Sequence, residues 1–226
     1  MDAPQNNRRR HSRFDLDGLS GFHVQIFGRS MSLADISGGG FAVEYPDVAL
    51  PLSSTMTAQL NILGLNIDSE IKIRHVGRYG LGFSLDPCEE GVPTLKKICS
   101  LFDLGAKAEF VVSRQRILGQ YTEYKTVGAS LRVKKNALGQ LKWLEFQLDD
   151  AEVRVLFDQG LLPRSTLRFK HAWMEGNVGI EGGALNFVIC FLVGMRAKHS
   201  SWVDPILEAL VRCRQHNDDV SLGAID

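Results

Sequence analysis

The chain has 226 residues, of which 44% are hydrophobic and 23% are charged, and these are ordinary values for a soluble globular protein. Lys and Arg together number 26, as do Asp and Glu, so no global field would draw the protein to nucleic acid or to a membrane. The length allows one large domain or two small ones, and any attraction for an anion must be local.

The first segment, residues 1–19, is predicted to be a flexible arm that is rich in arginine. Four arginines fall within six positions of the stretch RRRHSRF, residues 8–14. No apolar stretch follows this basic run, so it does not have the form of a secretory signal. A basic arm is a solvated tail, a nonspecific nucleic-acid arm or part of a built anion site, and the residues downstream have to distinguish these alternatives.

Short strands dominate residues 20–86. Met56, Ala58, Leu60 and Ile62 alternate with polar residues, which is the period of a strand with one buried face. Runs bounded by glycine or proline predict further strands at residues 22–27, 30–36, 40–46, 69–76 and 79–85. Five or six short strands at this spacing predict a small antiparallel barrel or sandwich.

A change of period after residue 86 predicts a helix that closes this first unit. An apolar stripe at helical spacing runs from Leu95 to Phe102. Pro93 suits the first helical turn, and Gly105 suits the end of the helix. We therefore expect a first domain over residues 1–105 and a second over residues 106–226.

The second half has the same alternating pattern and a final helix. Strands are predicted around apolar residues that alternate with polar ones: Ala129 to Val133, Leu144 to Leu148, Val153 to Phe157 and Leu167 to Trp173. Residues 106–126 fit a strand or a helix. The longest apolar run, residues 184–195, has 12 residues and predicts a buried strand, because it is shorter than the roughly 18 residues that span a bilayer. Asp204 and Pro205 suit the cap and first turn of the last helix.

These elements predict a mainly β fold with α: a six-stranded antiparallel barrel with a closing helix, followed by a second β-rich α+β domain that ends in a helix. Strands followed by a helix in both halves give a weak hint of duplication. The four cysteines, Cys88, Cys99, Cys190 and Cys213, lack the spacing of a zinc site, which favours reduced thiols. We expect a soluble cytoplasmic protein with no membrane span.

A glycine-rich loop follows the second predicted strand, in the stretch LADISGGGFAVE, residues 33–44. Glycine permits positive φ, and successive N–H groups in such a loop form a shallow anion nest. Ser37 adds a hydroxyl and Asp35 adds a carboxylate. Arginine forks bind phosphate oxygens or the O6/N7 edge of guanine, whereas a carboxylate repels phosphate but accepts the ring N–H and amino group of guanine. Taken alone, the loop is as consistent with a simple turn.

Arg9 and Arg13 form R-x-x-x-R, and Asp35, Ser37 and Gly40 form D-x-S-x-x-G. The order of the two motifs, their separation and the β-rich body with its helix resemble the PilZ domain over residues 6–104. That resemblance implies a six-stranded barrel with a helix that binds the bacterial second messenger cyclic di-GMP.

The resemblance also implies a role for each motif residue. Arg9 and Arg13 would clamp guanine edges and phosphates, Asp35 and Ser37 would hold a guanine and polar ligand atoms, and Gly40 would keep the turn open. Arg8 precedes the first motif arginine, where it would stack on a guanine and favour an intercalated pair of ligands. Arg10 and His11 are expected to face solvent.

We therefore expect a cyclic di-GMP receptor, not an enzyme, whose ordered arm rearranges the second domain to signal to a protein partner. The resemblance implies that this partner belongs to the motility, adhesion or exopolysaccharide machinery. No cofactor, metal or specific nucleic acid is expected. The alternatives are a scaffold that keeps the fold without binding the nucleotide, an enzyme, and nonspecific nucleic-acid binding by the arm.

Overall fold

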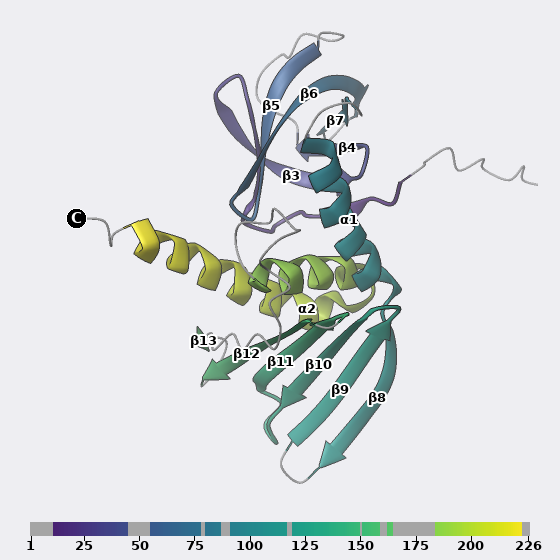
Figure 1. Cartoon of the computed structure of the whole chain (residues 1–226), viewed down its shortest axis with the longest axis vertical. Helices are drawn as coiled ribbons and strands as arrows, with labels where there is room; N and C mark the ends of the chain where they lie inside the picture. The colour runs from purple at the N-terminus through teal and green to yellow at the C-terminus, as the bar shows by residue number, and fades with distance from the viewer. Residues whose placement is uncertain are drawn as a thin grey trace, which may run out of the picture.

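The computed structural model describes residues 11–44, 55–77, 80–86, 91–116, 119–149, 151–158, 162–164 and 184–222. The fold is mainly β with α, as the sequence predicts: a closed antiparallel barrel, a second β-sheet and two helices. Figure 1 shows the barrel at the top, the second sheet at the bottom and the first part of the long helix α2 between them. Within the described residues, neither helix combines the length and apolar character needed to cross a bilayer.

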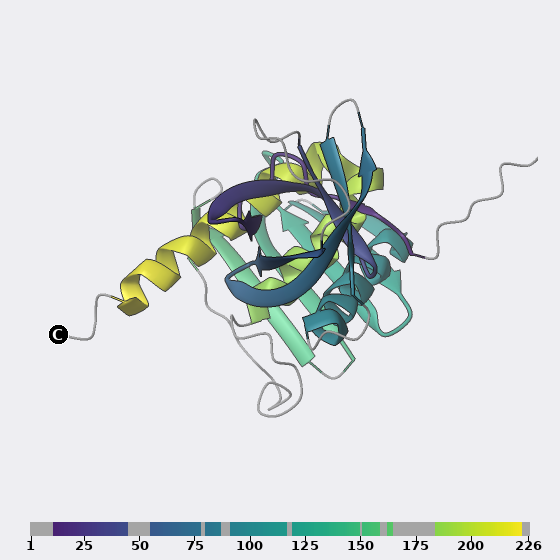
Figure 2. The ribbon, with the colours of Figure 1, turned by 90° about the horizontal axis from the view of Figure 1, so that it is seen from above.

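The barrel is built from the first seven strands: β1 (Phe14–Asp15), β2 (Phe22–Ile26), β3 (Arg29–Ser37), β4 (Gly40–Glu44), β5 (Thr55–Ile62), β6 (Leu65–Val76) and β7 (Gly80–Leu85). Six of them close into a ring in the order β3-β2-β5-β6-β7-β4, because β4 pairs back onto β3. The short strand β1 adds to β3 beyond the end of β2. Figure 2 shows these strands from above, curving around the barrel.

The alternation predicted for residues 55–62 is confirmed, since Met56, Ala58, Leu60 and Ile62 are all buried in the barrel core. Helix α1 (Gly91–Lys107) follows the barrel, and Pro93 lies in its first turn as expected. The predicted end at Gly105 is wrong, because the helix continues to Lys107.

Gly105 serves close packing instead of helix termination. A Cβ atom there would overlap the carbonyl group of Phe191 in α2 (Ala184–Leu222), and a Cβ at Gly194 of α2 would overlap the carbonyl of Phe102 in α1. The two glycines therefore let the backbones of α1 and α2 approach each other where the helices cross.

The second sheet is an open antiparallel meander in the order β13-β12-β11-β10-β9-β8. Its strands are β8 (Glu109–Arg116), β9 (Gly119–Thr126), β10 (Ala129–Lys135), β11 (Leu141–Leu148), β12 (Ala151–Asp158) and β13 (Leu162–Arg164). Residues 106–126, which fitted either structure, thus supply the end of α1 and two strands. The strands predicted near 129–133, 144–148 and 153–157 are confirmed, and the one predicted at 167–173 lies outside the described residues.

The strand predicted at residues 184–195 is wrong, since this run forms the first part of α2. Every residue from Leu185 to Met195 is buried, and Phe191 packs on Phe146 of the sheet with ring centroids 4.9 Å apart. A helix that is buried on all sides has no polar stripe, so the sequence lacks the alternation of apolar and polar residues that identifies an amphipathic helix.

A kink at His199 (φ −138°, ψ 25°) divides α2. The second helical part therefore begins before the position expected from Asp204 and Pro205, and Pro205 lies inside it.

Candidate functional site

The arm enters the fold along the outer edge of strand β3. Phe14 pairs with Ile36, and Asp15 pairs with Asp35, in an antiparallel register. The Phe14 side chain is buried and meets Phe102 of α1 edge to face, with ring centroids 5.1 Å apart. This anchor places the residues just before it, including Arg13, on the rim of the barrel.

Arg13 and Asp35 form a direct ion pair at this rim, although they are 22 residues apart in the sequence. Nη1 of Arg13 lies 3.0 Å from Oδ1 and 2.9 Å from Oδ2 of Asp35. The pair is partly open to solvent, with side-chain exposures of 40% for Arg13 and 28% for Asp35. The ion pair thus joins one residue of the R-x-x-x-R motif, Arg13, to one residue of the D-x-S-x-x-G motif, Asp35. Arg8 and Arg9 lie outside the described residues.

Ser37 and Gly40 build the turn that joins β3 to β4. The buried hydroxyl of Ser37 donates to the carbonyl of Gly40 at 3.0 Å and accepts the N–H of Gly39 at 3.5 Å. A Cβ atom at Gly40 would overlap the carbonyl oxygen of Phe83 in β7. Gly40 thus permits the close approach of β4 and β7, whereas the resemblance implied that it keeps the turn open.

The neighbouring glycines make room for His11 of the arm. A Cβ atom at Gly39 would lie 3.1 Å from Cδ2 of His11, and one at Gly38 would lie 3.4 Å from Nδ1. His11 is solvent-exposed, as expected, with its ring over the turn. None of the three glycines has a positive φ, so the left-handed conformation that glycine permits is not adopted at this turn.

A chain of ion pairs connects the arm to helix α2. Arg196 of α2 lies 3.6 Å from the Asp15 carboxylate and 3.5 Å from the Asp15 carbonyl oxygen. Its Nε donates to Asp204 at 2.9 Å. Since Arg196 precedes the kink at His199 and Asp204 follows it, this one side chain contacts the arm and both parts of α2.

A cavity of about 460 Å³ lies between the arm, α1 and α2. Its polar wall has carboxylates, arginines and hydroxyls, from Ser12, Arg13, Asp15, Asp103, Arg196 and Ser200. The volume falls in the range of small-molecule pockets, about 300–1,000 Å³. This junction could not be found from the sequence, because Arg196 follows a run that was expected to be a strand and its spacing from Asp15 carries no local signal.

The side chains of Cys99 and Cys190 are both buried. Burial, with a smaller contribution from the charge of Asp103, raises the pKa of Cys99 to about 12, so this thiol stays protonated at neutral pH. The described residues contain no group of three or more His, Cys, Asp or Glu side chains placed to hold a metal ion.

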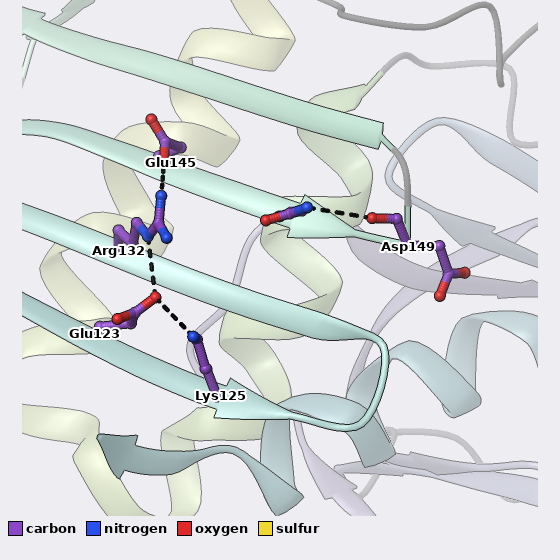
Figure 3. Close-up of polar contacts among 6 residues, drawn as sticks. Glu123, Lys125, Arg132, Glu145 and Asp149 are labelled. Atoms are coloured by element: carbon purple, nitrogen blue, oxygen red, sulfur yellow. Dashed lines mark hydrogen bonds and ion pairs between the residues drawn. The ribbon is translucent and has the colours of Figure 1, made fainter. Parts of the chain in front are cut away.

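A second charged cluster lies on the face of the second sheet that points away from α2 (Figure 3). Arg132 donates to Glu123 at 3.0 Å and to Glu145 at 2.8 Å, and Lys125 lies 3.4 Å from Glu123. Both glutamates are buried. The hydrogen bonds that Arg132 donates to the two carboxylates raise its pKa above its already high ordinary value. The arginine is thus held by two acids, as in a structural cross-strand ladder.

Comparisons with known proteins assign no family to the chain. No protein-family model matches the chain, and no curated protein matches it. Among solved structures, the chain is similar to the Legionella uncharacterized protein Lpg0364, with a TM-score of 0.34 and 13% sequence identity, over 39% of this chain and 90% of that one. Any function assigned to the rim or to the cavity therefore has to be argued from their own geometry.

Proposed function

We propose that the chain is a receptor for cyclic di-GMP with a PilZ-like barrel, and that Arg13 and Asp35 are at the centre of its ligand site. The observation that carries this proposal is the ion pair between them, which joins the R-x-x-x-R and D-x-S-x-x-G motifs on one rim of a six-stranded barrel. An arginine fork and a carboxylate side by side match the two faces of a guanine nucleotide. The arginine suits phosphate or the O6/N7 edge, and the carboxylate suits the N–H donors of the base.

The ligand would replace the ion pair by contacts of its own. An exposed pair of this kind is worth about 0.2–1 kcal/mol, so its loss is a small cost to binding. A bidentate contact of the arginine would in return distinguish a guanine from another base by about 1–3 kcal/mol. Arg8 and Arg9 precede this point in the sequence and would supply further guanidinium groups to the same ligand.

Movement of the arm would reach α2 through Asp15. Asp15 is two residues from Arg13, and Arg196 links it to Asp204 across the kink. Rearrangement of the arm would alter the contacts of Arg196 and so the angle between the two parts of α2. An output to a partner of the motility, adhesion or exopolysaccharide machinery would follow from this change.

Calorimetry with the full chain and cyclic di-GMP tests the assignment. Arg13→Ala and Asp35→Ala should each weaken binding about ten- to a hundredfold, the equivalent of 1–3 kcal/mol. Arg29→Ala is the matched control, because Arg29 is an exposed arginine elsewhere on β3, and it should leave the affinity unchanged. Cyclic di-AMP, which lacks the guanine donor set, should bind far more weakly. Wild-type affinity in both rim variants, or equal binding of the two dinucleotides, would refute the proposal.

Hydrogen exchange tests the coupling separately. Cyclic di-GMP should change the exchange of α2 amides around the kink in the wild-type chain, and Asp15→Asn should remove that change while the affinity stays near the wild-type value. An unchanged response in Asp15→Asn would exclude the Asp15–Arg196 route and leave the binding assignment intact.

A scaffold without nucleotide binding is the second candidate. It is favoured by the buried hydroxyl of Ser37, which is already bonded within its own turn, and by the mutual pairing of Arg13 with Asp35. The same titration distinguishes the two functions, since the scaffold gives no heat of binding with cyclic di-GMP.

A further inference from the structure

Strand β8 forms a border of the second sheet. Among the described strands it pairs only with β9, and Figure 1 shows no other element along its outer side. The backbone groups on that side are therefore available to an added strand. The opposite border, β13, has only three residues, so β8 is the longer open edge.

Two large apolar side chains are exposed on β8. Phe110 is 56% exposed and Val111 is 51% exposed, although soluble proteins seldom place such residues side by side on a strand that is open to pairing. Phe110 also meets Tyr124 of β9 edge to face, with ring centroids 6.1 Å apart.

A cavity of about 210 Å³ lies between Phe110 of β8 and Trp202 of α2. Tyr124, Val133 and Trp202 form its apolar wall, and Ser113 and Lys135 contribute polar groups. The volume is below the range of about 300–1,000 Å³ that is typical of small-molecule pockets. The cavity is therefore suited to a single large side chain of a partner.

The chain around this cavity is basic, although the protein as a whole is neutral. Lys135 lines the cavity, and β8 with its flanking residues has three basic residues, Lys107, Arg114 and Arg116, against one acidic residue, Glu109. This charge favours an acidic partner and opposes the pairing of two β8 strands from two copies of the chain.

A bulge at Val111 adds to this restriction. The register of β8 against β9 shifts between Phe110 and Val112, and it is regular from Val112 to Arg116. Bulges and basic residues are common devices against edge-to-edge association of like sheets. The regular stretch after the bulge remains long enough to pair with a short peptide.

The aromatic rings at this edge are largely used within the protein. Tyr124 is buried and stacks on Trp202, with ring centroids 5.2 Å apart and an interplanar angle of 22°, and His199 lies 5.1 Å from it. A single-stranded nucleic acid needs free aromatic faces for its bases. An extended peptide instead needs an open strand edge and a pocket for a side chain, and these are the features present.

We propose that the β8 edge binds an extended acidic segment of a partner protein as an additional strand, with one large apolar side chain of that segment in the cavity between Phe110 and Trp202. This interaction surface is independent of the nucleotide site at the barrel rim. It would give the second half of the chain its own partner whether or not the rim binds cyclic di-GMP.

Fluorescence anisotropy with the full chain and a labelled synthetic peptide tests this proposal. The probe has about eight residues, the length of an ordinary strand, with glutamate alternating with valine and one central phenylalanine. Phe110→Glu should weaken its binding at least about tenfold, as expected for the loss of an interface anchor. Val127→Glu is the matched control, because Val127 is 90% exposed in the β9–β10 turn and carries the same change of charge; it should leave binding unchanged. Circular dichroism checks that both variants fold.

Hydrogen exchange should show protection of the amides from Ser113 to Arg116 by the peptide, and a peptide with lysine in place of glutamate should not bind. The proposal is overturned if the acidic peptide does not bind, if Val127→Glu weakens it as much as Phe110→Glu, or if protection appears away from β8. Tighter binding of an oligothymidylate that depends on Phe110 would make the edge a nucleic-acid surface instead. A concentration-dependent dimer in sedimentation that Phe110→Glu abolishes would make it a self-interface.

Discussion

The barrel rim and the outer face of the second sheet both contain an arginine bound to carboxylates, but the two clusters differ in how the charges are compensated. Arg13 has one described carboxylate partner, Asp35, and that partner is 28% exposed. Arg132 has two, Glu123 and Glu145, with side-chain exposures of 9% and 8%. A single exposed pair can be exchanged for an incoming ligand at small cost, whereas removal of the central arginine takes a cation away from two buried acids at once, which is more costly. The rim is thus suited to binding and the sheet cluster to stability.

The largest expected effect is on the sheet cluster. Arg132→Met should lower the free energy of unfolding by about 3 kcal/mol, because it leaves Glu123 and Glu145 buried without their arginine. Urea denaturation at neutral pH measures this loss. Arg212→Met, which removes an exposed pair with Glu208, should cost well under about 1 kcal/mol.

Neutralising Glu123 and Glu145 tests whether their buried charge is the cause of the lost stability. Adding Glu123→Gln and Glu145→Gln to Arg132→Met should recover much of the lost stability, since the two buried negative charges are then gone. A loss as large in the triple variant as in Arg132→Met would mean that packing of the arginine, and not its charge, stabilises the sheet.

The second effect concerns the helix crossing that connects the two regions. Gly194→Ala should lower the free energy of unfolding by about 2 kcal/mol, because the new methyl group would overlap the backbone of α1. In a helix without such a contact the same change is stabilising, by up to about 1 kcal/mol. Thermal and urea unfolding give the sign directly, and an unchanged or higher stability would contradict the close crossing.

The third effect, the loss of stability when the Arg13–Asp35 ion pair is removed, should be small. Arg13→Ala and Asp35→Ala should each change the free energy of unfolding by less than about 1 kcal/mol, as is usual for exposed ion pairs. The same urea titrations test this. If either variant lost as much stability as Arg132→Met, the rim pair would be structural, and the contrast between the two clusters would fail.

The smallest effect is a pH dependence at the kink of α2. Burial, with a smaller contribution from Lys198, lowers the pKa of His199 below its ordinary value of 6.5. The unfolded chain therefore takes up a proton at His199 at a higher pH than the folded chain does. The free energy of unfolding should then decrease as the pH falls below about 6.5, the ordinary pKa of histidine. His199→Gln should reduce the decrease in stability between about pH 7.5 and 5.5. An identical decrease in both proteins would contradict this assignment.

Much of the barrel follows from the sequence, because its strands are short, alternate strictly and face one core. Met56 to Ile62 shows this most clearly. The helix at residues 184–195 could not be predicted in the same way. Its first part is covered on all sides, so the sequence shows an unbroken apolar run that fits a strand equally well.

The roles of the glycines and of the polar site could not be predicted from local sequence patterns, because they depend on contacts between distant residues. Gly105 and Gly40 have the local signature of a helix end and an open turn, but each is required by a backbone that is distant in sequence, Phe191 and Phe83 respectively. Both sequence motifs can be recognised in the chain, but the ion pair of Arg13 with Asp35 and the link from Asp15 to Arg196 depend on tertiary packing that leaves no pattern in the sequence.

The paired glycines of α1 and α2 have a practical consequence for anyone who divides this polypeptide. A fragment that stops at residue 105 would uncover the side of α1 on which Phe102 and Gly105 meet α2, and the complementary fragment would uncover Phe191 and Gly194. Each piece would expose the apolar surface of its helix to water and would tend to precipitate when produced alone. Co-expression of the two pieces, or a cut placed in a loop away from this seam, should instead yield soluble material.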